Sequence, residues 1–149
     1  MTAEFLVAAH ALAYLNRKKC CVSSEELAST ICTNPARIRK IMLKLKNAGL
    51  IETQSGKTGG YILTKAPEDV TLGEVAAATD GEIVDANWRP GNPHEDCLVT
   101  SGMGQVMDTV LAGLNKACFS YLAGITVKDI DRKLLFVNKK KQPRYNTGK

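Results

Sequence analysis

The chain has 149 residues and a net charge of +5, so it can form one domain with a real core or a small domain with an appendage. The positive balance suits a polyanionic partner. No apolar run approaches the roughly 18 residues of a membrane-spanning helix, which argues against a membrane protein. The five cysteines are an odd number and accompany no export signal, so we expect a protein of the reducing cytoplasm.

The first part of the chain predicts two helices. An amphipathic helix is expected from about Ala3 to Arg17, and it is not a secretory signal because no basic residues precede its apolar part. Ser23 and Glu26 then fit the capping-box pattern, which begins a second helix over the letters SEELASTIC.

The stretch from Asn34 to Leu63 carries the strongest pattern in the chain. Asn34 can cap a third helix, and Pro35 occupies its first position, where the missing N–H costs nothing. Apolar residues recur at helical spacing up to Ala48, and Gly49 is expected to end the helix in a left-handed conformation.

A hairpin is expected after that helix. Its strands fall at residues 50–53 and 61–63, and a polar, glycine-rich turn at residues 54–60 joins them. Three helices followed by a hairpin is the element order of a winged helix-turn-helix, here with the helix-turn-helix from about Ser23 to Ala48.

Basic residues on the third helix and the hairpin favour DNA binding. A helix in the major groove needs one apolar face for its own core and long polar side chains on the other face to reach phosphates and base edges. Arg37, Arg39 and Lys40 supply such side chains, and Lys57 adds charge to a hairpin tip that can approach a sugar-phosphate backbone closely. The simpler alternative is a helix with a solvated basic face, followed by an ordinary hairpin.

The second half of the chain predicts a long apolar helix outside this unit. A short helix from Leu72 to Thr79 comes first, and residues 82–96 have the composition of a long surface loop. The helix from about Met103 to Ala123 has so broad an apolar stripe that we expect it to pack on a partner, by default in a symmetric dimer.

The chain is expected to end in a short helix and a basic tail. Thr126 caps the helix VKDIDRKLLF, and residues 138–149 are expected to be disordered or in loose contact with DNA. The predicted fold class is mainly α with a small β-hairpin, a winged helix-turn-helix plus a long C-terminal dimerisation helix. We divide it into a winged helix-turn-helix DNA-binding domain at 1–66, a loop with dimerisation helices at 67–135 and a basic flexible tail at 136–149.

Two strings of residues carry a family resemblance. LKLKNAGLIETQSGKTGGYIL and APEDVTLGEVAAATDG, followed by a cysteine-bearing loop, a long helix and the segment ITVKDI, resemble the Rrf-two family over about residues 1–132. These are bacterial winged-helix transcription regulators of the IscR, NsrR and CymR kind. The resemblance implies a cytoplasmic homodimer held by the long helix, which reads a palindromic operator in double-stranded DNA.

The resemblance also implies which residues contact DNA. The helix Pro35–Ala48 would lie in the major groove, with Arg37, Arg39 and Lys40 as base or phosphate readers, and the wing Ser55–Tyr61 would lie at the minor groove. The residues expected at the DNA are Ser24, Asn34, Arg37, Arg39, Lys40, Lys44, Ser55, Lys57, Thr58, Gly60 and Tyr61.

Many members of the family hold an iron–sulfur cluster through three closely spaced cysteines in the loop before the long helix. In this sequence the loop holds only Cys97, and Trp88 and Asn92 stand near the other two positions. Because cluster ligation normally needs several thiolates, we expect no cofactor and no metal site.

Three of the five cysteines are expected to have no function of their own, and the other two are candidates for a redox switch. Cys118 lies on the apolar stripe and is expected to pack in a core, and Cys20 and Cys21 are expected to be spare thiols at a helix end. Cys97, alone in a polar loop, is a candidate for oxidation, and Cys32 in the helix-turn-helix is its candidate partner in a thiol switch that shifts the two reading heads. The alternative is a cysteine-independent regulator that senses a small molecule or a protein.

An enzyme is the least consistent interpretation, because the chain has two histidines and no nucleophilic triad, phosphate loop or HExxH-type site. A protein-interaction module that has lost DNA binding remains an alternative, as does RNA binding, although the chain has few aromatic residues for stacking. Repression is favoured over activation, because a compact dimer without an activation segment acts most simply by occlusion.

Overall fold

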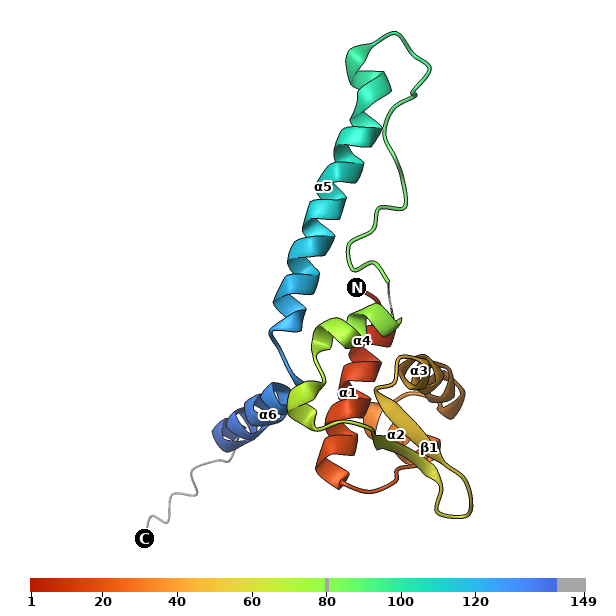
Figure 1. Ribbon diagram of the computed structural model, residues 1–149, viewed down its shortest axis with the longest axis vertical. Coiled ribbons are helices and arrows are strands. Elements are labelled where there is room, and N and C mark those ends of the chain that lie inside the picture. The colour runs from red at the N-terminus through yellow and green to blue at the C-terminus, as the bar shows by residue number, and fades with distance from the viewer. Residues whose placement is uncertain (80, 142–149) are drawn as a thin grey trace.

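Helix α1 is the centre of the fold, and most of the other helices pack around it, while the long helix in the second half of the chain extends away from this core (Figure 1). The computed structural model describes residues 1–79 and 81–141. Its elements are α1 (Ala3–Lys18), α2 (Ser24–Ile31), α3 (Pro35–Asn47), β1 (Ile51–Gln54), β2 (Gly60–Leu63), the short 3₁₀ helix η1 (Pro67–Asp69), α4 (Leu72–Thr79), α5 (Leu98–Ala123) and α6 (Val127–Lys141). The expected winged helix-turn-helix with a long C-terminal helix is confirmed.

The helix-turn-helix forms where its capping residues predict it. The Ser23 hydroxyl accepts from the Glu26 N–H at 3.1 Å, and the Asn34 side chain accepts from the Arg37 N–H at 2.8 Å. Helix α3 ends at Asn47, one residue earlier than expected, and Gly49 then adopts a left-handed φ of 73°. These caps satisfy backbone N–H groups that would otherwise have no partner at the start of each helix.

The hairpin is fastened to the connection between α1 and α2. Strands β1 and β2 are antiparallel, with Ile51 opposite Leu63. The Val22 N–H donates to the Tyr61 carbonyl at 3.1 Å, and the Tyr61 N–H donates to the Val22 carbonyl at 2.8 Å. A Cβ on Gly60 would lie 2.2 Å from the Val22 carbonyl oxygen, so only glycine allows the wing to approach this closely.

One hydrophobic core joins the winged helix to the start of the C-terminal half. Val70, Val75 and Val127 belong to the same buried cluster as the apolar residues of α1, α2 and α3. The largest side chains that are fully buried are Leu12, Leu27, Ile38, Ile41, Met42, Leu45, Leu50, Ile51, Val22, Val70, Val75 and Val127. Helix α4 and the first turn of α6 are therefore part of the winged helix's own core.

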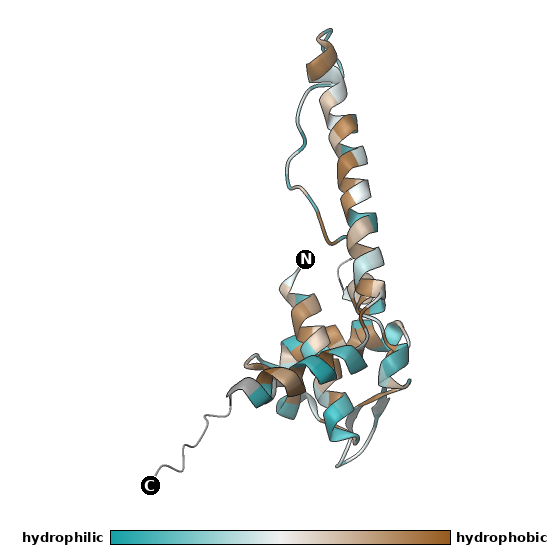
Figure 2. Cartoon of the chain, turned by 90° about the vertical axis from the view of Figure 1, so that its left-hand side faces the viewer, coloured by the Kyte–Doolittle hydropathy of each residue, from teal (hydrophilic) through white to brown (hydrophobic). Residues whose placement is uncertain are grey.

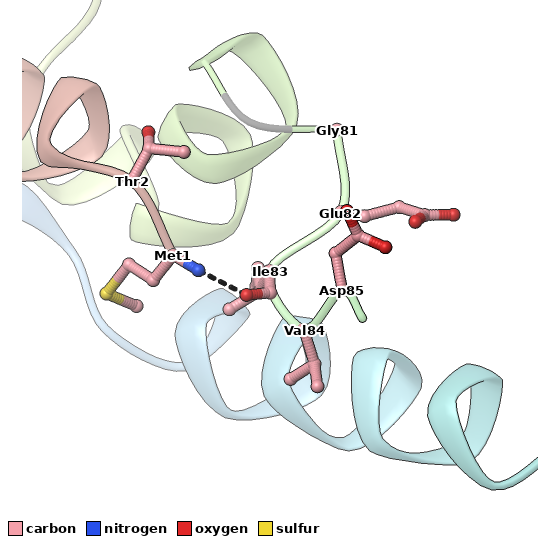
Figure 3. A pocket seen from close by; sticks show the side chains of 7 residues that line it. All are labelled: Met1, Thr2, Gly81, Glu82, Ile83, Val84 and Asp85. Carbon is pink, nitrogen blue, oxygen red and sulfur yellow. Dashed lines mark hydrogen bonds between the residues drawn. The ribbon is translucent and has the colours of Figure 1, made fainter. Parts of the chain in front are cut away.

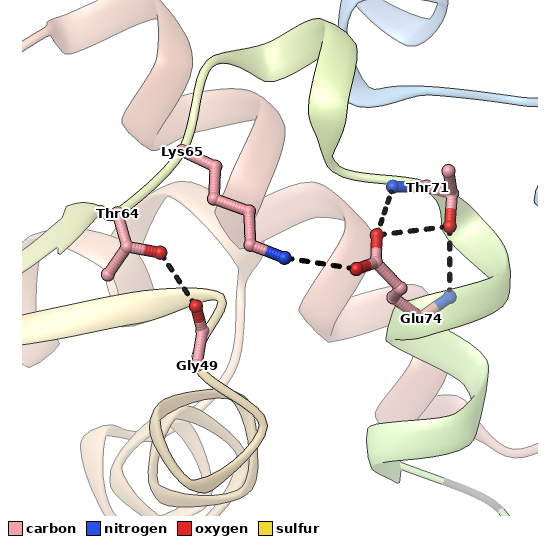
Figure 4. Close-up of polar contacts among 5 residues, drawn as sticks. All are labelled: Gly49, Thr64, Lys65, Thr71 and Glu74. Carbon is pink, nitrogen blue, oxygen red and sulfur yellow. Dashed lines mark hydrogen bonds and ion pairs between the residues drawn. The ribbon is translucent and has the colours of Figure 1, made fainter.

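Polar contacts fix the segment between the hairpin and α4 (Figure 4). The Glu74 carboxylate accepts from the Thr71 N–H at 2.9 Å, and the Glu74 N–H donates to the Thr71 hydroxyl at 3.2 Å, which is a complete capping box. Lys65 donates to the other Glu74 oxygen at 3.2 Å, and the Thr64 hydroxyl donates to the Gly49 carbonyl at 2.7 Å.

Two expected boundaries are wrong. Helix α5 begins at Leu98, five residues before Met103, because residues 98–102 contain no helix breaker other than Gly102 and continue the apolar pattern. Helix α6 is not short: it extends through Lys141, so residues 136–141 of the expected flexible tail are helical. The rest of that tail, 142–149, lies outside the described residues.

Candidate nucleic-acid interface

Helix α3 and the hairpin are neighbours at the end of the molecule opposite the free end of α5 (Figure 1). The apolar face of α3 supplies Ile38, Ile41, Met42 and Leu45 to the core, which leaves its basic residues on the outer side. Arg37 is exposed and has no ion pair among the described residues, so its guanidinium is free to bind an anion.

Arg39 connects α3 to α2. Its Nη1 donates to the Ser24 hydroxyl at 3.1 Å and to the Glu25 carboxylate at 3.2 Å, while 55% of the side chain stays exposed. The pKa of Glu25 is lowered by its own backbone N–H first, then by the Ser24 hydroxyl and by Arg39. Ser24 is buried, so it positions Arg39, whose remaining N–H groups can still reach outward.

Glu4 of α1 binds two lysines of α3. Lys40 lies 3.3 Å from one carboxylate oxygen and is 69% exposed, so it can still exchange this partner for a phosphate. Lys44 pairs with the other oxygen and also donates to the Thr79 carbonyl at 3.2 Å. The Lys44 ammonium holds the pKa of Glu4 below its ordinary value. The structure thus places the Lys44 ammonium between α1 and α4, apart from the outer residues of α3.

The wing residues divide into an exposed tip and a structural base. Ser55, Lys57 and Thr58 are exposed between the two strands. Gly60 and Tyr61 are half-buried at the base, where they contact Val22 through the backbone. Burial raises the pKa of the Tyr61 hydroxyl, which keeps it neutral. Asn34 has a structural role as well, because its side chain caps α3.

Sequence reasoning missed the carboxylates that bind these basic residues. Glu4 and Lys44 are 40 positions apart, and Glu25 and Arg39 are 14 apart. Spacing rules apply to residues a few positions apart, so these ion pairs can be recognised only once the packing of the helices is known. Both carboxylates lower the net positive charge of this surface.

The long loop and α5 form a second candidate site. The loop runs beside α5, and the Met1 amino group donates to the Ile83 carbonyl at the loop's start (Figure 3). A cavity of about 530 Å³ opens between loop and helix, with Trp88, Met107 and Leu111 among its lining residues. Arg89 and Asp108 form an ion pair of 2.6 Å at its rim. Apolar walls with a few polar groups suit a small organic molecule.

The side chains around the loop do not fit an iron–sulfur cluster. Cys97 is the one thiol of the loop, and a cluster needs several. Among the described residues, no three His, Cys, Asp or Glu side chains lie close enough together to hold a metal ion.

Cys97 is exposed at the N-terminus of α5. Its pKa is lowered by the Thr100 hydroxyl first, and then by the backbone N–H groups of Thr100 and Val99. Cys32 is exposed at the end of α2. The start of α5 and α2 lie at opposite ends of the molecule, so one chain does not bring these two thiols together (Figure 1).

The fold and this surface define a class, the winged-helix DNA-binding regulators. A transcriptional regulator of Lactobacillus plantarum has a similar structure, with a TM-score of 0.78 and 24% identity over 94% of this chain and 97% of that one. IscR of T. potens aligns with a TM-score of 0.66 and 19% identity, over 95% and 90% of the two chains. These likenesses establish the fold.

The family follows from the sequence comparisons. The family model described as Rrf2, iron-dependent transcriptional regulator, matches residues 1–133, and the chain belongs to this family. YwnA of Bacillus subtilis is 27% identical over 132 residues, which are 87% of this chain and 96% of that protein. The rrf2-like regulator of Rhodobacter capsulatus is 33% identical over 73 residues, and the chain spans about half the length of that relative, 49%. The protein is a transcriptional regulator and not an enzyme.

No helix within residues 1–79 and 81–141 is long and apolar enough to cross a membrane.

Proposed function

We propose that this Rrf2-family regulator is a cytoplasmic homodimeric repressor that binds a palindromic operator in double-stranded DNA. The observation that supports the proposal is the grouping of exposed Arg37, Arg39 and Lys40 on α3 beside a wing tip that carries Lys57. The major groove is about 12 Å wide and admits one helix, and these side chains are long enough to reach base edges and phosphates from it. Lys44, Asn34 and Gly60, which are also expected at the DNA, hold the surface together through their contacts with Thr79, the start of α3 and Val22.

Helix α5 supports the dimer. Of its 26 residues only Gly104 and Leu122 are buried in the protomer, and brown apolar segments recur along its length between paler and teal ones (Figure 2). Val106, Val110 and Leu114 are each about half exposed. An apolar helix that projects into water is explained by a second copy on the same face, and a symmetric dimer brings two copies of α3 to two half-sites.

Two glycines support the same interface. Gly102 and Gly113 are 11 residues apart, close to three full turns, so they share the face that holds Val106. A Cβ at either would meet nothing within 4 Å in the protomer. Each glycine weakens the helix by about 1 kcal/mol relative to alanine, a cost that close approach of a second α5 would offset.

The test is a gel shift with genomic fragments that include the regulator's own promoter, followed by footprinting. We expect a two-fold symmetric footprint and a loss of affinity of about tenfold to a hundredfold for Arg37→Glu. Lys128→Glu is the matched control, because it makes the same charge change on α6, where Lys128 pairs with Glu68. Equal affinities of the two variants would contradict the proposal and favour a module that no longer binds DNA.

The exposed thiols support redox regulation of this repressor without a cluster. Oxidation of Cys97 would give a sulfenic acid or a disulfide, and a disulfide with Cys32 would have to join the two protomers, since one chain keeps these residues apart. The purified protein should be colourless. Oxidant should release DNA from the wild type, and Cys97→Ser should resist it; a variant that releases DNA like the wild type would contradict the switch.

The cavity beside α5 supports a second candidate, a small-molecule effector that acts without cysteines. Its lining joins the loop to the helix that we assign to the dimer, so an occupant could change the spacing of the two reading heads. Val84→Trp would fill this cavity from the loop side. The test adds a metabolite extract of the source cells to the gel shift and looks for release of DNA. If a small molecule regulates the protein, Val84→Trp should bind DNA but no longer release it when the extract is added. Cys97→Ser should still release DNA in the extract.

A further inference from the structure

The adjacent thiols Cys20 and Cys21 lie in the connection between α1 and α2, immediately before the residue that holds the wing. Cys20 is exposed and Cys21 is half-buried, and both are free. Val22 follows and exchanges two backbone hydrogen bonds with Tyr61 of β2. Ser23 then caps α2. Any group that joins the two sulfurs acts directly on the backbone between the end of α1 and the base of the wing.

We propose that Cys20 and Cys21 form a dithiol site for a thiophilic electrophile that takes two thiolates, of the monoorgano-arsenic(III) class, and that occupation of the site loosens the wing. Its consequence for DNA rests on the proposed function, but the binding itself does not. Arsenic(III) is soft and prefers sulfur ligands, as soft metal ions do.

Geometry favours a bridging atom over a disulfide. Consecutive Cα atoms lie about 3.8 Å apart across a trans peptide. A disulfide usually needs about 4.4 to 6.8 Å between its Cα atoms, so a direct bond between Cys20 and Cys21 would be strained. An arsenic atom inserted between the sulfurs enlarges the ring by one atom and relieves this strain. Cys20 and Cys21 are therefore expected to stay reduced under conditions that oxidise the other exposed thiols, Cys32 and Cys97.

The chemistry balances without an oxidant. With phenylarsine oxide, each thiol loses its proton and forms one As–S bond, and the arsenic-bound oxygen leaves with the two protons as water. Arsenic stays trivalent throughout. Once the first As–S bond has formed, the second thiol attacks intramolecularly at high effective concentration, which makes the bridged adduct far more durable than an adduct of one thiol.

The wing is the element that the bridge disturbs. Closing the ring restricts the backbone dihedrals of Cys20 and Cys21, and Val22 is 1% exposed, so it cannot follow without disturbing its packing. A Cβ on Gly60 would lie 2.2 Å from the Val22 carbonyl oxygen, so there is little room for Val22 to shift toward the wing. The hydrogen bonds between Val22 and Tyr61 are therefore the expected point of failure.

The experiment titrates the full chain with phenylarsine oxide and follows it by intact mass. We expect one adduct, with the mass of the reagent less one water, that survives excess 2-mercaptoethanol and is removed by 2,3-dimercaptopropanol. Cys32→Ser/Cys97→Ser should keep this adduct, whereas Cys20→Ser and Cys21→Ser should each lose its resistance to the monothiol. A durable adduct in Cys21→Ser, or its loss from Cys32→Ser/Cys97→Ser, would overturn the site.

Hydrogen exchange tests the wing without reference to DNA. In the adduct, the amides of Val22 and Tyr61 should exchange about fivefold to tenfold faster, the change expected when one hydrogen bond is lost. The amide of Arg37, capped by Asn34 at the start of α3, should not change. Unchanged exchange at Val22 and Tyr61 would overturn the coupling of this site to the wing.

Discussion

The side chain of Asn115 on α5 binds both backbone groups of Val84. Its Oδ1 accepts from the Val84 N–H at 2.8 Å and from the Ile83 N–H at 2.9 Å, and its Nδ2 donates to the Val84 carbonyl at 2.7 Å. One amide thus reproduces the pairing of a β-strand and fixes the long loop to the helix. Asn115→Leu should lower the free energy of unfolding by about 2 to 3 kcal/mol, since three hydrogen bonds are lost and three backbone groups are left without a partner.

Urea unfolding measures that loss, and hydrogen exchange of the Ile83 and Val84 amides shows where it occurs. Gln105→Leu, an exposed position on the same helix, is the control and should change stability by less than about 0.5 kcal/mol. If Asn115→Leu were equally mild, the loop would be held by its packing on α5 and not by this amide.

The wing should contribute charge to DNA binding and little sequence preference. Lys57→Ala removes one exposed ammonium at the hairpin tip, so affinity should fall by a similar factor for every DNA sequence. The slope of log affinity against log salt should decrease in magnitude by about 0.9, the value for one phosphate contact. Binding isotherms at four salt concentrations, with operator and with unrelated DNA, measure both quantities. A loss confined to the operator would instead assign base reading to the wing.

Local sequence patterns predicted nearly all of the helices and strands of the winged helix. The contacts that they did not predict join residues that are far apart in the sequence. Ser23, Asn34, Pro35 and Gly49 act within a few residues of themselves, so the sequence shows their caps directly. The partners of Arg39 and Lys44 come from other helices, and the fastening of Tyr61 to Val22 comes from backbone groups that every residue has. Such contacts carry no signature in composition or spacing.

The error at the start of α5 concerns two glycines. Gly102 and Gly104 stand on either side of Met103, where the helix was expected to begin, and glycine disfavours a helix interior. In the structure Gly104 lets the loop lie against the helix, since a Cβ there would meet Arg89 Nε and the Pro90 carbonyl at 3.0 Å. A glycine that serves packing cannot be distinguished by sequence alone from one that ends an element.

The thiol of Cys97 should depend on Thr100 for its reactivity. The Thr100 hydroxyl is the first cause of the lowered pKa of Cys97, because it stabilises the thiolate. Thr100→Val keeps the shape of the side chain and removes this donor, so the pKa should rise toward its ordinary value. Alkylation of Cys97 by iodoacetamide, followed by peptide mass spectrometry across pH, should then reach its half-maximal rate at a higher pH. An unchanged pH profile would leave the backbone N–H groups as the cause.

Acid should weaken the fold partly through Glu74. The Thr71 N–H, followed by Lys65 and the Thr71 hydroxyl, lowers the pKa of this carboxyl in the folded state. Its stabilising contribution is therefore present above the unfolded pKa, near about 4.3, and is lost as the pH falls through the lower folded pKa. Glu74→Gln removes the titration, so its unfolding free energy should fall less steeply below about pH 5 than that of the wild type. Thermal melts from pH 3 to pH 7 measure this pH dependence, and Glu52→Gln on the hairpin is the control. If the curves of Glu74→Gln and the wild type ran parallel, Glu74 would not contribute to the loss of stability in acid.

The interface assigned to α5 predicts a clear change in oligomeric state. Val106 is 58% exposed in the protomer and lies on the same face as Gly102 and Gly113. In a dimer, Val106→Lys would bury a charge without a partner, which is strongly unfavourable, so the dissociation constant should rise by at least about a hundredfold. Analytical ultracentrifugation should show a monomer for this variant and a dimer for Leu43→Lys, a matched change at a 56% exposed position on α3.

The monomeric Val106→Lys variant should keep the helical circular dichroism of the wild type, because Val106 contributes nothing to the core of the protomer. Its affinity for the operator should fall far more than that of Lys57→Ala. A dimeric Val106→Lys would place the contact between protomers on another face of the molecule.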